Sequence, residues 1–156
     1  MSYQDFVSDV IKKAGKSILS LFHDPKVEYT KDTLHQVVTK ADLESQKIIV
    51  SAIKDMFPTH GIVAEEEGAR CQTEAEYVWY VDPLDGTKNF ASRVPLYGVN
   101  IGLARDGKMI CGAIYLPSTD ELCFAEFSTG AFLNGERVHC SEQKEWDYSY
   151  GISPIR

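Results

Sequence analysis

The chain has 156 residues, the length of one ordinary domain, and 44% of them are apolar, which is enough for a hydrophobic core and excludes a disordered chain. Its 16 basic and 23 acidic residues give a net charge of −7, which argues against a general nucleic-acid binder, because phosphate neutralisation requires clustered Lys and Arg. No apolar run approaches the length of a membrane span, so we expect no membrane partner either.

An amphipathic helix is predicted at the start of the chain. Ser2 is typical of an N-cap, and apolar residues then recur at intervals of three and four as far as Phe22. The pair Asp24-Pro25 breaks the helical pattern, and a short strand is predicted over residues 27–30. A helix of this kind can bind a membrane surface or pack in a core, and we expect core packing.

A second amphipathic helix is predicted over residues 43–57, and Pro58 is expected to end it. Its expected apolar face consists of Leu43, Ile49, Ala52, Ile53 and Met56. Asp42 has the chemistry of a residue that caps such a helix, and capping is the role that the residues alone predict for it.

Three consecutive acids, Glu65, Glu66 and Glu67, follow a short apolar strand predicted over residues 61–64. Acidic runs commonly form solvated loops. Carboxylates crowded at the end of a buried strand, however, repel one another unless a cation relieves them. The residues alone therefore leave a solvated loop and a metal site open.

The most informative stretch, Asp82–Phe90, follows an apolar run that is typical of a buried strand. Pro83 has no amide hydrogen and cannot continue a sheet ladder, so the strand is predicted to end at Asp82. Gly86 allows a tight turn and a close approach of the backbone. Thr87 is expected to be the N-cap of a short helical turn.

This stretch combines two kinds of binding group. The carboxylates of Asp82 and Asp85 are hard oxygen ligands that suit a divalent cation, whereas free amides at a helix start suit an anion. Asp-Pro and Asp-Gly are also ordinary turn residues, but a turn alone does not explain two acids, a Gly-Thr pair and an aromatic residue together. A metal beside a phosphate indicates a metal-assisted phosphatase.

The second half of the chain predicts strands joined by tight turns. Strands are expected over residues 96–105, 108–116 and 121–127. The expected turns are Asp106-Gly107, Pro117–Asp120, Thr129-Gly130 and Asn134-Gly135. Two helices followed by successive hairpins predict an α+β domain in which the helices pack on a largely antiparallel sheet.

The four cysteines form no C-x-x-C pair, which argues against a zinc site. Cys111 and Cys123 lie in apolar, strand-like runs, so both are expected to be buried thiols. Together with the lack of a basic signal-peptide region at the start, the cysteines predict a reduced, cytoplasmic setting.

Four stretches together resemble the inositol monophosphatase family, within the larger group of magnesium-dependent, lithium-sensitive phosphatases. In chain order they are Val38–Asp42, Ala64–Glu66, Asp82–Phe90 and Gly130–Gly135. The third stretch is highly specific, and the four cover nearly the whole chain. The resemblance implies that residues 1–156 correspond to the first domain of the family fold and that its second α/β domain is absent.

The resemblance also implies site residues. Magnesium ions would be held by Glu65, Asp82, Asp85 and the main-chain carbonyl of Leu84. The substrate phosphate would lie along Glu65, Leu84, Asp85, Gly86 and Thr87, with the amides of Gly86 and Thr87 donating hydrogen bonds to it. Glu65 and Thr87 would orient the attacking water, Asp42 would accept a hydrogen bond from Thr87 and help to remove its proton, and Glu66 would support the site from behind.

The implied activity is hydrolysis of a small phosphorylated substrate, such as inositol monophosphate, by a metal-activated water. Lys88 resembles the nucleotide-bisphosphate phosphatase branch, whereas Asn89-Phe90 resembles the inositol branch. A nucleotide 3′,5′-bisphosphate and fructose 1,6-bisphosphate therefore stay open as substrates.

The expected absence of the second domain leaves one alternative, a non-catalytic magnesium- and phosphate-binding or regulatory domain. In the family that domain supplies a further metal-ligand aspartate in a Trp-Asp motif. Trp146-Asp147 is superficially similar, but Tyr148 and Tyr150 stand where small residues are expected, so we expect no metal role for Asp147. An exposed sheet edge over residues 148–155 would favour a homodimer or a partner that supplies the missing domain.

Overall fold

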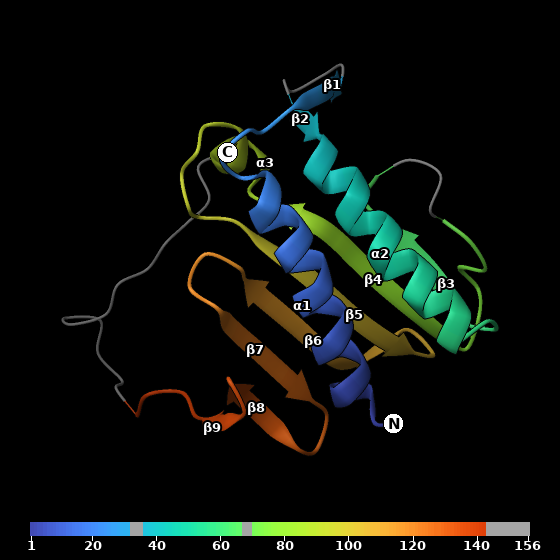
Figure 1. The fold of residues 1–156 in the computed structure, drawn as a ribbon. Coiled ribbons are helices and arrows are strands. Elements are labelled where there is room, and N and C mark those ends of the chain that lie inside the picture. Colours follow the sequence, from blue (N-terminus) through green and yellow to red (C-terminus); the bar gives the residue numbers. More distant parts are fainter. Residues whose placement is uncertain (32–35, 67–69, 143–156) are drawn as a thin grey trace.

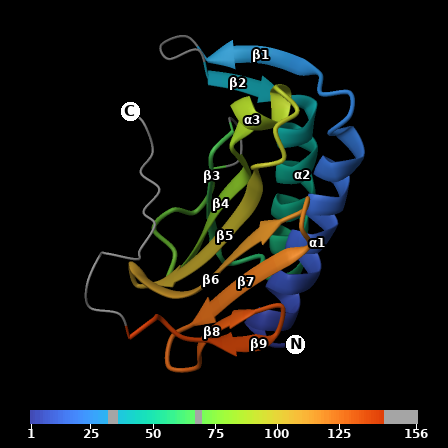
Figure 2. The ribbon, with the colours of Figure 1, turned by 90° about the vertical axis from the view of Figure 1, so that its left-hand side faces the viewer.

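The computed structural model describes residues 1–31, 36–66 and 70–142. Two long helices, α1 (Tyr3–Leu21) and α2 (Lys40–Met56), pack side by side on one face of a seven-stranded sheet. Figure 2 shows both helices on the same side of the sheet, and no helix of the described residues covers the other side. The α+β fold expected from the sequence is confirmed.

The seven strands lie next to one another in chain order. They are β3 (Gly61–Ala64), β4 (Tyr77–Asp85), β5 (Gly98–Arg105), β6 (Lys108–Leu116), β7 (Glu121–Glu126), β8 (Gly130–Leu133) and β9 (Glu136–Val138). β3 and β4 are parallel, whereas the pairs from β4 to β9 are antiparallel, as a meander requires. The hairpins predicted at Asp106-Gly107 and Asn134-Gly135 are confirmed, and both residues of each turn have positive φ, as type I′ turns require.

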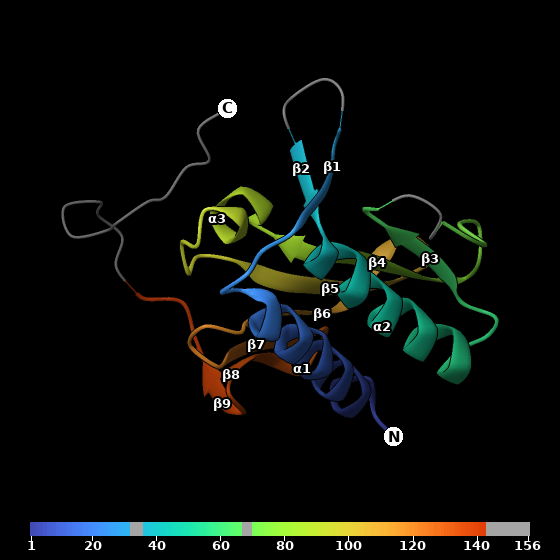
Figure 3. The ribbon, with the colours of Figure 1, turned by 45° about the horizontal axis from the view of Figure 1, so that its top comes forward.

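A separate antiparallel hairpin is formed by β1 (Val27–Lys31) and β2 (Gln36–Thr39). Figure 3 shows it standing at the start of α2, beside the short helix α3 (Thr87–Ala91). The strand expected over residues 27–30 is therefore confirmed, and β2 adds a partner that the sequence analysis did not assign.

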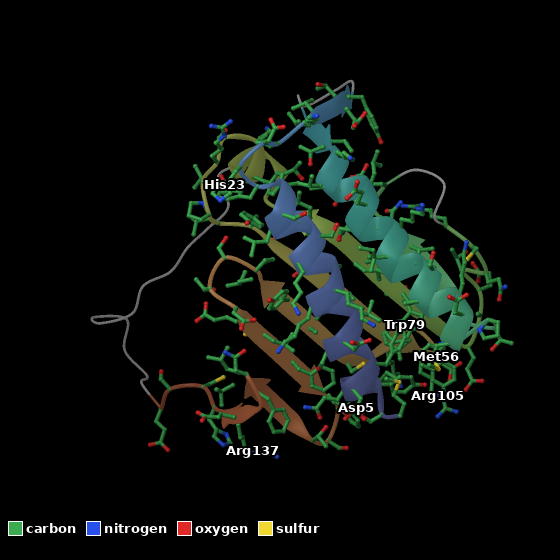
Figure 4. The ribbon with its side chains drawn as sticks, in the orientation of Figure 1. Asp5, His23, Met56, Trp79, Arg105 and Arg137 are labelled. Atoms are coloured by element: carbon green, nitrogen blue, oxygen red, sulfur yellow. The ribbon has the colours of Figure 1, made fainter. Side chains whose placement is uncertain are left out.

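The core lies between the helices and the covered face of the sheet. The first helix contacts β5, β6 and β7, and the second contacts β4. Gly15 allows this approach, because a Cβ atom there would lie 2.4 Å from the ring of Tyr115. Trp79 is fully buried, and Figure 4 places it near Met56, at the end of α2, and Arg105, away from the end of the molecule near His23. The first helix thus packs in the core as expected, and no helix of the described chain is long and apolar enough to span a bilayer.

The second helix differs from the prediction at its start and on its face. Thr39 rather than Asp42 is its N-cap, and Lys40 is its first residue. Asp42 caps the helix from the third helical position, where its side chain accepts a hydrogen bond from the Thr39 amide. Leu43 and Met56, expected on the apolar face, are 37% and 50% exposed. The buried face of α2 instead includes polar residues near the start of the helix. It therefore lies on a different side of the helix from the predicted apolar face.

Three further expectations are corrected. The strand β4 runs through Pro83 to Asp85, because the proline lies at a register shift between β4 and β5 where a ladder hydrogen bond is not required. The strand β5 begins at Gly98 rather than residue 96, and Leu96 is exposed. Cys111 is buried as expected, but Cys123 is exposed because alternate residues of β7 face away from the helices.

Candidate active site

Two acids meet where the parallel pairing of β3 with β4 ends. The last residue of β3, Ala64, pairs with Val81, so Glu65, which follows β3, lies beside Asp82, which continues β4 opposite Asn100. The Glu65 amide donates to the Val81 carbonyl at 3.1 Å, which extends the ladder by one step. The acids predicted to share a site are therefore brought together by strand register.

The carboxyl group of Asp82 lies in a crowded, partly buried position. Burial, the adjacent Glu65 carboxyl and the charge of Asp85 together raise the pKa of Asp82 to about 7. The Leu84 amide donates to Asp82 Oδ1 at 3.2 Å and opposes this shift. The three acids therefore interact, and a bound cation would relieve their repulsion.

A second centre links the start of α2 to the start of α3. Asp42 is 1% exposed, and its Oδ1 accepts a hydrogen bond from the Thr87 hydroxyl at 3.0 Å. Its Oδ2 accepts from the amide and the hydroxyl of Thr39, at 2.8 and 2.6 Å. Burial raises the pKa of Asp42, and the hydrogen bonds from Thr39 oppose that rise. The pairing of Asp42 with Thr87 implied by the family resemblance is present.

The single hydrogen of the Thr87 hydroxyl has two acceptors within reach, Asp42 Oδ1 and the Leu84 carbonyl at 2.9 Å, which share it. The Leu84 carbonyl, the predicted metal ligand, keeps a second lone pair. Thr87 is the first residue of α3 rather than its N-cap, so that prediction is wrong. Gly86 is the N-cap, with φ 82°, and this conformation frees the threonine hydroxyl to point at Asp42 and Leu84.

Two residues of α2 hold the site in place and were missed by the sequence analysis. The Ser45 hydroxyl donates to the Pro83 carbonyl at 2.7 Å, and the Gln46 side-chain oxygen accepts from the Glu66 amide at 3.0 Å. With Asp42 they form a polar face at helical spacing i, i+3 and i+4. That spacing, just before the apolar residues Ile49 and Ile53, is the signal that could have identified them.

Glu66 is 2% exposed, and its Oε2 accepts a hydrogen bond from the Tyr29 hydroxyl at 3.3 Å. This contact ties the β1–β2 hairpin to the acidic loop and fits the supporting role expected of Glu66. Glu67 and Asp147 lie outside the described residues, as does the sheet edge expected over residues 148–155.

Two hollows adjoin the acids. The smaller, of about 260 Å³, is lined by Val37, Glu65, Glu66, Gly86, Thr87, Lys88 and Asn89. The larger, of about 860 Å³, lies on the uncovered face of the sheet and includes Glu65 and Asp82 in its lining. Glu65 therefore stands between the two, and the smaller hollow provides room for a phosphate group beside the start of α3.

The donor set fits a magnesium ion. Carboxylate and carbonyl oxygens are its preferred protein ligands, and it usually keeps several waters and binds substrate oxygens. Among the described residues, no three His, Cys, Asp or Glu side chains are already arranged around one point. A cation here would accordingly be held by one or two carboxylates, with the Leu84 carbonyl, waters and substrate completing its shell.

The chain is similar to the model of a known family and to curated relatives. The model of the inositol monophosphatase family matches residues 2–154. A Vibrio cholerae protein named Nus factor SuhB is 38% identical over 135 residues, which are 86% of this chain and 51% of the relative. A Thermotoga maritima protein named fructose-1,6-bisphosphatase/inositol-1-monophosphatase is 31% identical over 153 residues, 97% of this chain and 58% of the relative.

The fold is shared with solved structures as well. The extragenic suppressor protein suhB from Bartonella henselae superposes with a TM-score of 0.83 at 32% identity, over 90% of this chain and 55% of that one. The chain spans about half the length of the curated relatives that it matches, between 51% and 58% for the two named above.

Proposed function

Because the chain belongs to the inositol monophosphatase family, we propose that it carries the catalytic groups of a magnesium-dependent phosphomonoesterase that acts on a small phosphorylated substrate such as inositol monophosphate. One observation carries the proposal: the Thr87 hydroxyl, which donates a hydrogen bond to Asp42, belongs to a residue that lines the same hollow as Glu65, and Glu65 in turn lies beside Asp82.

In this proposal the residues divide the tasks between them. Glu65, Asp82, Asp85 and the Leu84 carbonyl would hold magnesium, with one or two of these carboxylates on an ion, and the metal would supply a water of lowered pKa and stabilise the charge of the leaving oxygen. Thr87 and Glu65 would orient the attacking water for in-line displacement at phosphorus. Asp42 accepts a hydrogen bond from the Thr87 hydroxyl. With its hydrogen directed at Asp42, the oxygen of Thr87 would accept a hydrogen bond from the water.

The first turn of α3 is proposed to bind the phosphate. The backbone amides of Gly86 and Thr87 would donate to its oxygens, and Lys88 and Asn89 line the same hollow. An exposed lysine there can attract a second phosphate, so a nucleotide 3′,5′-bisphosphate stays a candidate beside inositol monophosphate. Fructose 1,6-bisphosphate is a further candidate, supported by the name of the Thermotoga relative.

The second candidate function is a non-catalytic domain that binds magnesium and phosphate. It is favoured by the lack of three preassembled acidic ligands in the described part of the chain. Turnover separates the two candidates. We also propose a reducing, cytoplasmic location, supported by four cysteines that form no disulfide.

The test is release of inorganic phosphate from inositol 1-phosphate, a nucleotide 3′,5′-bisphosphate and fructose 1,6-bisphosphate, with and without magnesium. Asp85→Asn is purified in parallel, with Asp55→Asn, an exposed substitution on α2, as matched control. Turnover that requires magnesium and is lost only in Asp85→Asn supports the enzyme. Turnover unchanged in Asp85→Asn overturns it, and magnesium binding without turnover favours the binding domain.

A further inference from the structure

Asn100 carries an unpaired polar atom beside the acids. Its side-chain oxygen, Oδ1, is buried, and no donor of the described residues forms a hydrogen bond with it. A buried acceptor without a donor destabilises a fold, and such atoms are rare in folded proteins. The presence of this unpaired oxygen in β5 therefore requires an explanation.

The strand register places this atom next to the proposed cation site. Asn100 pairs directly with Asp82 on β4 and with Ile114 on β6. Directly opposed residues of antiparallel strands project to the same face, with Cβ atoms about 5 Å apart. Asn100 and Asp82 therefore lie side by side on the uncovered face, and both line the larger hollow with Glu65.

In the described chain no side chain donates to the Asn100 oxygen. The neighbours two residues away on β5, which share its face, are Gly98 and Gly102 and have no side chains. Ile114 on the other side is apolar. Across the strand pair lies Asp82, and when its carboxyl group is ionised, as it must be to hold a cation, it accepts hydrogen bonds and cannot donate one.

The missing partner must be a hydrogen-bond donor that arrives with the ligand. A phosphate dianion is an acceptor and does not fit this requirement. A water bound to a magnesium ion fits, because both of its hydrogens point away from the metal and magnesium keeps several waters in protein sites. Groups that do not touch a metal but form hydrogen bonds with its ligands contribute strongly to the affinity of the site for the metal.

We propose that Asn100 is a positioning residue of the cation site, and that its Oδ1 accepts a hydrogen bond from a water bound to the ion held by Asp82. The proposal rests on the proposed function, since it requires a cation at Asp82. It assigns to β5 a contribution to a site otherwise built from β3, β4, α2 and α3.

The test compares two substitutions of nearly equal size, Asn100→Leu and Asn100→Asp, by thermal melting without metal and by calorimetric titration with magnesium. Asn100→Leu removes the unpaired acceptor, so it should melt at a higher temperature without metal and bind magnesium about tenfold more weakly. Asn100→Asp adds a charge beside Asp82, so it should melt at a lower temperature without metal and bind magnesium more tightly. Ile114→Val, from the adjacent strand on the same face, is the control.

A purely structural role for Asn100 gives a different pattern. Both variants would then melt lower without metal, and both would keep the magnesium affinity of the unmodified protein, which overturns the inference and leaves the proposed function intact. If the unmodified protein binds no magnesium, the proposed function and this inference are both overturned. Opposite shifts in the affinities of the two variants support the inference.

Discussion

The hydroxyl of Thr87 lies 3.0 Å from Oδ1 of Asp42, although 45 residues separate the two in sequence. The other carboxylate oxygen is held by Thr39, so the Asp42 side chain is fixed from both sides. This one contact joins the start of α2 to the start of α3 and fixes the direction in which the Thr87 oxygen presents its lone pairs.

Asp42→Asn should lower kcat by about 10²–10⁴-fold and leave KM nearly unchanged. The amide keeps the size of the side chain, but its NH2 group can face Thr87 and reverse the direction of the hydrogen bond. Steady-state kinetics with each substrate of the panel measures the effect. A variant with kcat within twofold of the unmodified protein contradicts the assignment, and Asp55→Asn controls for the loss of one negative charge.

Asp82→Asn should stabilise the metal-free protein and abolish its stabilisation by magnesium. The substitution removes one of three mutually repelling carboxylates, and we expect a gain of roughly 1–2 kcal/mol after discounting for solvent screening. A ligand that binds only the folded state raises the melting temperature, so the magnesium-induced rise should disappear. Melting curves with and without the metal test both statements, and a rise equal to that of the unmodified protein would contradict them.

The parts of the site that the sequence predicted are those set by local chemistry. The two acids of residues 82–85 and the following Gly-Thr pair were identified from adjacent residues, and the hairpins from their turn residues. The strand end at Pro83 was mispredicted, because a bulge removed the conflict between proline and the ladder. The roles of Ser45 and Gln46 could not be predicted, because they depend on which carbonyl or amide the tertiary fold brings opposite the helix.

The same distinction applies to caps and burial. Only Asp42 was predicted to cap the second helix, whereas in the structure Thr39, the last residue of β2, is the N-cap and Asp42 completes a capping box with it. Cys123 was expected to be buried because its strand is apolar on both faces. Its exposure follows from the arrangement of layers, since α1 and α2 cover only one face of the sheet in the described chain.

Ser45→Ala should destabilise the protein by about 1–2 kcal/mol and also reduce kcat/KM. The serine is fully buried, and its removal leaves the Pro83 carbonyl without this donor. Because Pro83 lies between Asp82 and Leu84, a shift of its peptide group moves two proposed ligands. Urea unfolding gives the stability change, and magnesium titration gives the effect on the site. Ser20→Ala on the exposed side of α1 is the control.

His60 should make stability pH-dependent. Its Nδ1 accepts a hydrogen bond from Trp79 Nε1 at 3.0 Å, and burial lowers its pKa below the ordinary value of 6.5. The unfolded chain therefore binds a proton at a higher pH than the folded chain. Stability from this group is fully present above pH 6.5 and is lost as the pH falls from there toward the folded-state pKa.

Melting temperatures measured at pH 7.5 and pH 5.5, two values chosen to bracket the ordinary histidine pKa of about 6.5, test this dependence. His60→Gln keeps a polar acceptor and cannot titrate, so its melting temperature should fall less over the same interval. An equal fall in the variant would assign the pH dependence to other groups.

Gly86→Ala should destabilise the protein by about 2–4 kcal/mol and remove activity, whereas Gly107→Ala should cost about 1 kcal/mol and leave activity unchanged. Both glycines have positive φ, 82° and 74°, so both substitutions carry the same backbone penalty. They differ in their surroundings. A Cβ atom on Gly86 would lie 2.8 Å from the Leu96 carbonyl oxygen, whereas one on Gly107 meets nothing within 4 Å. The difference between the two variants in the free energy of unfolding, measured in urea, thus reports the effect of the close contact alone. Equal losses of stability would mean that the turn before Thr87 can shift to accommodate a side chain.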